Sequence, residues 1–263
     1  KSTTGVDLTS AQKTNLETAL APYKVASITP VVVDTETTSL ILGITIMYDS
    51  SSTTYTAPQI ASLVSTTVSN YSDTSLETFN TPFRHSRLLG LIDNTDTSIL
   101  NSVATVTLAK LFTPTLSTAT DYRINFNNKF YNPHSGHNAS AGGIIASTGF
   151  YLNSVTTTTY FFDDDGIGNL RIYYLVSGVR TYTNNAAGTV DYINGLITIG
   201  SIIITGVAEV DGTTSSQIRV TSLPNSNDIT PVRNQILEID LQNTTYNGSV
   251  DTTTSSGVGY STT

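Results

Sequence analysis

The sequence contains no cysteine and no tryptophan, and only one methionine. Without cysteine the chain can form no disulfide, no zinc thiolate and no thiol nucleophile. Charged residues make up only 12% of the chain, so threonine, serine and asparagine must supply most of its polar surface. The longest apolar runs, such as residues 202–204, are far shorter than the ~20 residues that a membrane-spanning helix needs. These absences exclude a disulfide scaffold and predict no membrane contact.

Basic residues are also scarce. The chain has 12 Lys and Arg against 20 Asp and Glu, a net charge of -8 and a pI near 4.6. An acidic chain without a basic stripe is repelled by the phosphate backbone, so no nucleic-acid partner is predicted. Threonine is branched at Cβ and suits strands, whereas serine, asparagine and glycine suit turns. The composition therefore favours a mostly β protein.

Residues 1–112 are expected to form an α+β unit in which helices cover one face of a small sheet. A threonine stands three residues before a glutamine at Thr9 and again at Thr56, which is the spacing of a helix capping box. Apolar residues alternate strictly from residue 40 to 48, which predicts a strand with one buried face. The expected elements are helices at 8–20, 57–71 and within 83–93, and strands at 28–33, 40–48 and 98–112.

Residues 113–247 are expected to form a mainly antiparallel β domain, either a meander or a sandwich-like arrangement. Apolar and polar residues alternate there with a period of two. Turn dipeptides separate the alternating runs, and they stand at Asp165-Gly166, Ser177-Gly178, Asn194-Gly195 and Asp211-Gly212. Residues 248–263 show no periodicity and have few apolar residues, so they are expected to be a flexible tail rich in Ser, Thr and Gly. The predicted fold class is α+β.

The stretch FFDDDGIGNLRIYY, residues 161–174, holds three consecutive aspartates and could be a chemical site. An EF-hand calcium loop needs an oxygen ligand at its fifth position and a glutamate at its twelfth. Counted from Asp163 these positions are Ile167 and Tyr174, so the stretch fails as an EF-hand. It is interpreted as a hairpin turn whose aspartates lie in water, and Asp164→Asn is then expected to leave folding intact. A weak calcium site of another kind at Asp163 to Asp165 is the alternative.

Histidines and arginines form two further small clusters. His134 and His137 have a His-x-x-His spacing, but a metal site needs a third ligand and none is evident nearby, so a solvated loop is favoured. Arg84, His85 and Arg87 form a basic cluster in an acidic chain. They could pair with neighbouring carboxylates, which is the favoured interpretation, or contact an acidic partner. No metal and no cofactor is predicted.

Catalytic signatures are missing from the sequence. It contains no Gly-x-Ser-x-Gly elbow, no His-Glu-x-x-His and no phosphate-binding glycine loop. A glycosidase needs only two carboxylates, and these are plentiful, but the chain lacks the tryptophans that commonly stack on sugar rings. The prediction is that the protein is not an enzyme.

Six segments of the chain, taken in order, are ITPVVVD (28–34), MYD (47–49), FNTPFRHSRLLGLIDNTDTSILNS (79–102), FFDDDGIGNLRIYY (161–174), GTVDYINGLITI (188–199) and ITPVRNQILEID (229–240). In their order and spacing, these segments resemble the C-terminal half of the baseplate wedge subunit of T-even-like contractile-tailed bacteriophages, a family related to the J-type baseplate ring proteins. Members of that family have an additional N-terminal half. The chain begins at Lys1 without a signal-peptide pattern, so a fragment or processed product is expected.

The resemblance implies a structural role in the virion and no catalytic residues. In the family, subunits join other wedge proteins, and six wedges close into a ring around the tail hub. We therefore expect a homo-oligomer, most simply a dimer, which is assembled in the host cytoplasm, contacts other baseplate wedge proteins and ends up in the tail baseplate. The candidate partner contacts are Arg84, His85, Arg87, Arg233 and Asn234.

Two other functions stay open at this stage. The chain has 14 tyrosines, which can stack on sugars as well as pack sheets, so it could be a carbohydrate- or receptor-binding module of a phage tail fibre. An enzyme that acts on cell-wall polymers is the third possibility, and it requires a catalytic carboxylate that the sequence does not single out.

Overall fold

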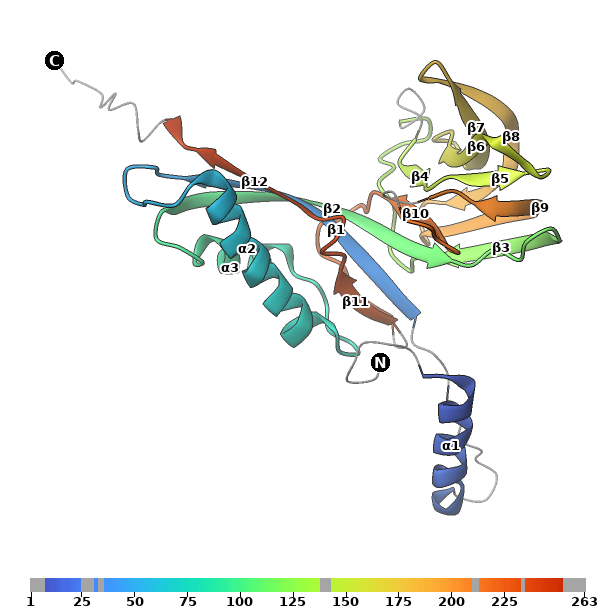
Figure 1. Ribbon diagram of the computed structural model, residues 1–263, viewed down its shortest axis with the longest axis horizontal. Coiled ribbons are helices and arrows are strands. Elements are labelled where there is room, and N and C mark those ends of the chain that lie inside the picture. Colours follow the sequence, from blue (N-terminus) through green and yellow to red (C-terminus); the bar gives the residue numbers. More distant parts are fainter. Residues whose placement is uncertain are drawn as a thin grey trace.

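The computed structural model describes residues 8–24, 31–32, 36–137, 143–209, 213–232 and 235–252. Its strands form two six-stranded sheets, and α2 and α3 lie on one side of the first sheet, which confirms the α+β class (Figure 1). The helices are α1 (Ser10–Leu20), α2 (Ala57–Tyr71) and α3 (His85–Asp93), with a 3-10 turn at Ala21–Tyr23 and a π-helical turn at Ser72–Leu76. No helix among the described residues has the length and apolarity needed to cross a membrane.

The first sheet is built on two long antiparallel strands, β1 and β2. Its strand order is β11-β1-β2-β10-β4, and β12 also pairs with β1. In Figure 1, β2 runs from the helix-covered end of the molecule to the second sheet. The strands of this sheet are β1 (Glu36–Tyr48), β2 (Ile99–Phe112), β4 (Ile145–Ser147), β10 (Ile218–Ser222), β11 (Gln235–Ile239) and β12 (Thr245–Val250).

The predicted alternation in β1 is confirmed. Every second residue from 40 to 48 is apolar and at most 4% exposed. These side chains share one hydrophobic core with the buried stripe of α2, whose members recur at helical spacing. Complete burial of each such side chain contributes about 1.5–3 kcal/mol relative to exposure. The stripe of α2 consists of Ile60, Val64, Val68 and Tyr71.

Both predicted capping boxes form. The side chains of Gln12 and Gln59 accept from the backbone N–H groups of Thr9 and Thr56. These interactions satisfy backbone donors that a helix start leaves unpaired. The two helices then differ in their surroundings, because α2 packs on the sheet whereas α1 has no buried residue and lies apart from both sheets in Figure 1.

The last three strands return to the first sheet. β11 pairs in parallel with the first half of β1, and β12 pairs in parallel with its second half. The periodicity suggested that every strand after residue 112 belongs to a second sheet. Instead, β4, β10, β11 and β12 belong to the first sheet. Residues 248–250, which the composition placed in a flexible tail, belong to β12; residues 253–263 lie outside the described part of the chain. A Cβ at Gly248 would lie 2.7 Å from the Ala57 carbonyl oxygen, so glycine allows β12 to approach α2.

The second sheet is antiparallel, as predicted, and its strands close into a small barrel. Its path is β3-β9-β5-β6-β7-β8, and an additional β8–β9 pairing joins the ends of the last five strands. Closure leaves these strands without open edges over the paired residues. The strands are β3 (Ala119–Asn125), β5 (Phe150–Leu152), β6 (Val155–Asp164), β7 (Asn169–Val176), β8 (Val179–Asp191) and β9 (Leu196–Val207).

Three of the four predicted turn dipeptides lie between barrel strands. The turns are those at residues 165–166, 177–178 and 194–195; the dipeptide at 211–212 and most of the predicted strand at 28–33 fall outside the described residues. Gly195 has a φ of 65°, and a Cβ there would lie 2.0 Å from the Asn128 carbonyl oxygen. Only glycine fits this turn, because both its backbone conformation and its packing exclude a side chain.

Candidate functional site

The start of α3 is fixed by one aspartate from a distant loop. Asp228 accepts hydrogen bonds from Arg84 Nη1 and from the His85 backbone N–H, each at 2.9 Å. The hydrogen bond from the His85 backbone, followed by the one from Arg84, lowers the pKa of Asp228 below its ordinary value. Asp228 therefore binds two groups at the N-terminal end of the helix, where the helix dipole favours a negative charge.

The other basic side chains of this segment also have partners within the chain. His85 Nε2 lies 2.9 Å from the Ala104 carbonyl oxygen on β2, and since a carbonyl can only accept, Nε2 donates. The Arg87 guanidinium lies 5.9 Å from the centre of the Tyr71 ring, and its side chain is exposed. The structure thus brings Arg84, His85 and Arg87 together. Arg233 and Asn234 lie outside the described residues.

Removal of the Asp228 carboxylate is expected to destabilise the protein in a pH-dependent way. Its side chain is 41% exposed, so solvent screens its charge, and we expect Asp228→Ala to cost about 1 kcal/mol at neutral pH. The folded-state pKa is lowered, so the contribution is present above about pH 4 and is lost as the pH falls through the folded-state pKa. Urea unfolding at pH 7 and pH 3 measures this. An equal loss at both pH values would contradict the assignment.

The three aspartates at residues 163–165 differ in their exposure to solvent. The solvent-exposed interpretation is wrong for Asp163 and Asp164, which are 1% and 0% exposed. Asp164 Oδ1 accepts from the backbone N–H groups of Ile144 and Ile145 at 2.6 and 2.8 Å. Its Oδ2 accepts from Tyr192 Oη at 2.5 Å. Burial, and then the hydrogen bond to Asp164, raises the pKa of Tyr192 well above its ordinary value.

Asp163 is held by two arginines and a tyrosine from β7 and β8. Its Oδ1 accepts from Arg171 Nε at 2.9 Å, and its Oδ2 accepts from Arg180 Nη1 at 2.8 Å and Tyr182 Oη at 2.9 Å. Burial raises the pKa of Asp163, and the hydrogen bonds from Arg171 and Tyr182 oppose that rise. Each guanidinium also lies over an aromatic ring, Arg171 over Tyr182 and Arg180 over Tyr173. The Asp163 carboxylate therefore stabilises the barrel by linking β6 to β7 and β8.

The third aspartate forms the turn itself. Asp165 Oδ1 accepts from the backbone N–H groups of Ile167 and Asn169, both at 2.9 Å. Hydrogen bonds from Asn169 and Ile167 lower the pKa of Asp165 against the opposing effect of burial, which is the largest single influence. The predicted hairpin turn is therefore correct, and side-chain acceptors within the turn hold its backbone.

His134 and His137 are neighbours on an exposed loop. His134 Nε2 and His137 Nδ1 are 3.1 Å apart, and the His137 ring also meets Tyr131 edge to face. In the described part of the chain, no three His, Asp or Glu side chains group closely enough to hold a metal ion. Gly136 N–H donates to the Gly166 carbonyl at 2.9 Å, so this loop packs on the turn of the β6–β7 hairpin.

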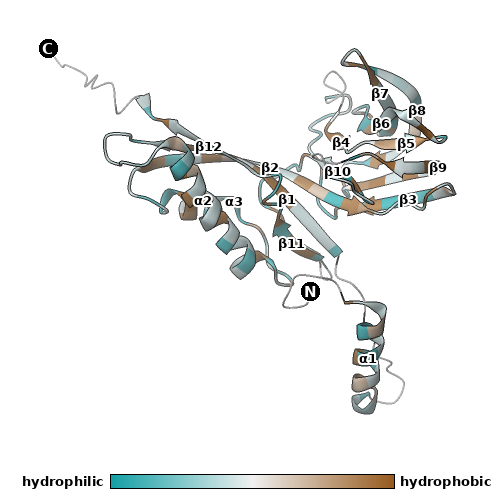
Figure 2. Ribbon diagram, viewed as in Figure 1, coloured by the Kyte–Doolittle hydropathy of each residue, from teal (hydrophilic) through white to brown (hydrophobic). Residues whose placement is uncertain are grey.

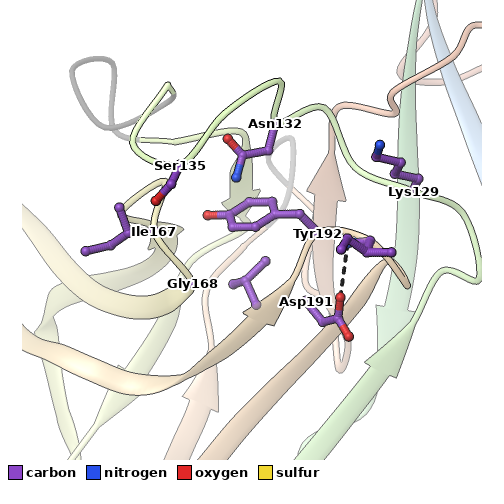
Figure 3. Close-up of a pocket in the computed structure, with 9 residues that line it drawn as sticks. Lys129, Asn132, Ser135, Ile167, Gly168, Asp191 and Tyr192 are labelled. Carbon is purple, nitrogen blue, oxygen red and sulfur yellow. Dashed lines mark hydrogen bonds between the residues drawn. The ribbon is translucent and has the colours of Figure 1, made fainter.

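A cavity of about 550 Å³ lies between that loop, the β6–β7 turn and the β8–β9 turn. Figure 3 shows the Tyr192 ring beside Asn132, which comes from another segment, with Lys129 to one side and Asp191 below. Both oxygens of Asp191 accept hydrogen bonds from the turn residues Ile193 and Asn194. No local sequence pattern indicates this cavity, because its walls come from three separate segments of the chain.

The first sheet has one broad face that no helix covers. Residues of β1 alternate between the buried side and this side, and the residues that pair with them on β2 and β12 point the same way. None of the side chains from residue 41 to 47 of β1, or of their partners on β2 and β12, is charged, although the chain carries a net charge of -8. Farther along the same side of the sheet lie Glu238 on β11 and Arg219 on β10. We call this surface the open face. It consists of Ile41, Gly43, Thr45, Met47, Asn101, Val103, Thr105, Thr107, Thr245, Asn247 and Ser249.

In Figure 2, β1 and β2 are drawn mainly in white and brown, so few residues of these two strands are strongly hydrophilic. Val103 stands near the centre of the open face on β2 and is 60% exposed. Uncharged sheet surface with exposed apolar side chains is typical of a protein–protein contact, because charged residues are depleted from the centre of such contacts.

Buried carboxylates that hold hairpins together, and a sheet surface with exposed apolar side chains, are typical of a protein built for structure and assembly. Residues 40–111, which run from β1 through α2 and α3 to β2, match the family model described as baseplate structural protein gp6, C-terminal domain III. This match confirms the resemblance to the baseplate wedge proteins of T4-like contractile-tailed phages. The chain thus has a structural role in the virion tail baseplate and associates with other baseplate proteins. A comparison with curated proteins finds no match.

Proposed function

We propose that this baseplate protein self-associates as a dimer after synthesis in the host cytoplasm and so links neighbouring wedges into the ring around the tail hub. The observation that carries the proposal is the open face. Two identical acidic surfaces repel each other, whereas an uncharged surface can meet its own copy around a two-fold axis. The uncharged part of the sheet formed by β1, β2 and β12 is therefore a surface on which a chain of net charge -8 can pair with itself.

The start of α3 is proposed as a second contact, directed at other wedge proteins. Arg84 and His85 are tied to Asp228 and Ala104, so their positions are fixed before any partner arrives. Arg87 has an exposed side chain and no ion pair among the described residues. It is the member of this cluster best placed to meet an acidic partner. Arg233 and Asn234 remain proposed contacts on the grounds of the resemblance alone.

The tail-fibre alternative depended on tyrosines that are free to stack on a sugar, and the barrel tyrosines are already packed. The tyrosines of the β6–β7–β8 hairpins pack against each other: the rings of Tyr160 and Tyr174 are 5.8 Å apart, and those of Tyr173 and Tyr182 are 5.9 Å apart. Tyr173 is only 8% exposed. Rings engaged in this way stabilise the sheet and offer little free surface for stacking on a sugar.

Val103→Glu is expected to weaken self-association at least about 100-fold, because each copy then brings a carboxylate to the uncharged interface and like charges there cost several kcal/mol. Val179→Glu is the matched control, since Val179 is 68% exposed on the barrel strand β8 and distant from the open face. Sedimentation equilibrium over a concentration series measures both. A strictly monomeric wild-type chain at high concentration, or equal effects of the two variants, would overturn the proposal.

A further inference from the structure

We infer that the barrel carries a docking groove for an acidic, apolar segment of a neighbouring baseplate protein. The groove consists of two cavities that share Asp191 and Ile193 in the β8–β9 turn, and we call it the Ile193 groove. One cavity is about 550 Å³ and the other is about 490 Å³. The inference rests on the structural role in the baseplate, since it assumes that the ligand is a protein.

The charge of the groove is opposite to the charge of the chain. Lys129 lines one cavity and Arg123 lines the other, and neither forms an ion pair with any residue that the structure describes. Asp191 lies between them, but its oxygens already accept hydrogen bonds from Ile193 and Asn194. Two cations without partners in a chain with only 12 basic residues favour an anionic ligand.

An apolar anchor point stands between these two cations. Ile193 is 74% exposed, and Ile167 on the opposite wall is 62% exposed. Exposing two isoleucines at the mouth of a cavity is unfavourable unless a partner covers them. A free sugar phosphate or an inorganic anion does not cover apolar side chains, so the groove fits a ligand that combines acidic with aliphatic groups.

Amide side chains line the groove. Asn132 lines one cavity, although its Oδ1 is buried and so does not face the ligand. Amide side chains line the other cavity as well, at Asn125, Asn127 and Asn194. Amide groups pair well with a peptide backbone, which offers N–H donors and C=O acceptors in alternation. A bound extended peptide can therefore pair with the amides of Asn125, Asn127 and Asn194, and this favours a peptide over a lipid.

The test uses the whole chain, labelled with ¹⁵N and titrated with a short synthetic peptide that contains several glutamates and an isoleucine. Amide chemical shifts are followed by NMR. We expect the shifts to centre on residues 129–132 and 191–194, and the affinity to fall as salt is added. The double variant Arg123→Gln and Lys129→Gln is expected to weaken binding about tenfold, through the loss of two exposed charge pairs. The matched control Lys24→Gln removes an exposed cation that does not line the groove, and it is expected to leave the affinity within about twofold.

Three results would overturn the inference. They are equal binding of a peptide with lysines in place of its glutamates, shifts that centre on the start of α3, and unchanged affinity in the double variant. Failure here is distinguishable from failure of the proposed function, because the Val103→Glu experiment tests the open face and does not involve the groove. If Val103→Glu separates the copies while the peptide fails to bind, only the groove is wrong.

Discussion

Asp164→Asn is expected to lower the free energy of unfolding by about 3 kcal/mol, because buried hydrogen-bond donors lose the negatively charged carboxylate that accepts from them. The carboxylate is fully buried and accepts from two consecutive backbone N–H groups through one oxygen and from Tyr192 through the other. An asparagine side chain offers only one acceptor oxygen. Either the backbone N–H groups of Ile144 and Ile145 or the Tyr192 hydroxyl therefore loses its acceptor. The remaining hydrogen bonds also lose the help of the negative charge.

Thermal and urea unfolding measure this effect, and a loss of this size corresponds to roughly 6–12 °C in the melting temperature for a chain of this length. Asp121→Asn is the matched control, because it is the same substitution at an exposed position of β3. Its free energy of unfolding is expected to stay within about 0.5 kcal/mol of the wild-type value. An Asp164→Asn variant as stable as the wild type would restore the solvent-exposed interpretation of the aspartates.

Local features of the fold could be predicted because local sequence determines them. A capping box at Thr9 or Thr56 involves residues only three positions apart, and the alternation in β1 follows directly from the period of a strand. The turn at Asn194-Gly195 has the same origin, since glycine there accepts a positive φ. The match of residues 40–111 covers the region in which such local signals were densest.

The return of the C-terminal strands could not be predicted in this way. Ser39 on β1 bonds to Glu238 on β11, 199 residues further along the chain. Periodicity shows that a segment is a strand and which side is buried, but it does not identify the neighbouring strand. The open face was missed for the same reason, because its uncharged character emerges only when β1, β2 and β12 lie side by side.

The burial of the aspartates illustrates a second limit. Three acids in a Gly-rich turn are more often solvated than buried, and the local sequence supplies only some of their donors, Arg171 to Asp163 and the Gly166 N–H to Asp164. The other donors to Asp164 come from residues 144, 145 and 192, and those to Asp163 come from residues 180 and 182 on β8. Barrel closure brings these segments together, so the acids become sites of tertiary structure that only the fold reveals.

Asp163→Ala is expected to lower the free energy of unfolding by about 3–5 kcal/mol, because it leaves a largely buried arginine without its counter-charge. Arg171 is the arginine at risk: its side chain is only 15% exposed, whereas that of Arg180 is 38% exposed and can turn to water. Arg171 also donates to the Asp164 carbonyl oxygen at 2.8 Å, so it is held in place even when Asp163 is gone.

A double-mutant cycle separates the pair from its surroundings. Arg171→Ala in the Asp163→Ala background is expected to cost less than in the wild type, by a coupling energy of about 1–3 kcal/mol, since the unpaired charge has already been removed. The same cycle with Arg180→Ala is the matched control, and its coupling is expected to stay below about 1 kcal/mol because solvent screens the more exposed guanidinium. Additive effects of Asp163→Ala and Arg171→Ala in urea unfolding would show that the buried pair does not stabilise the β6–β7–β8 hairpins.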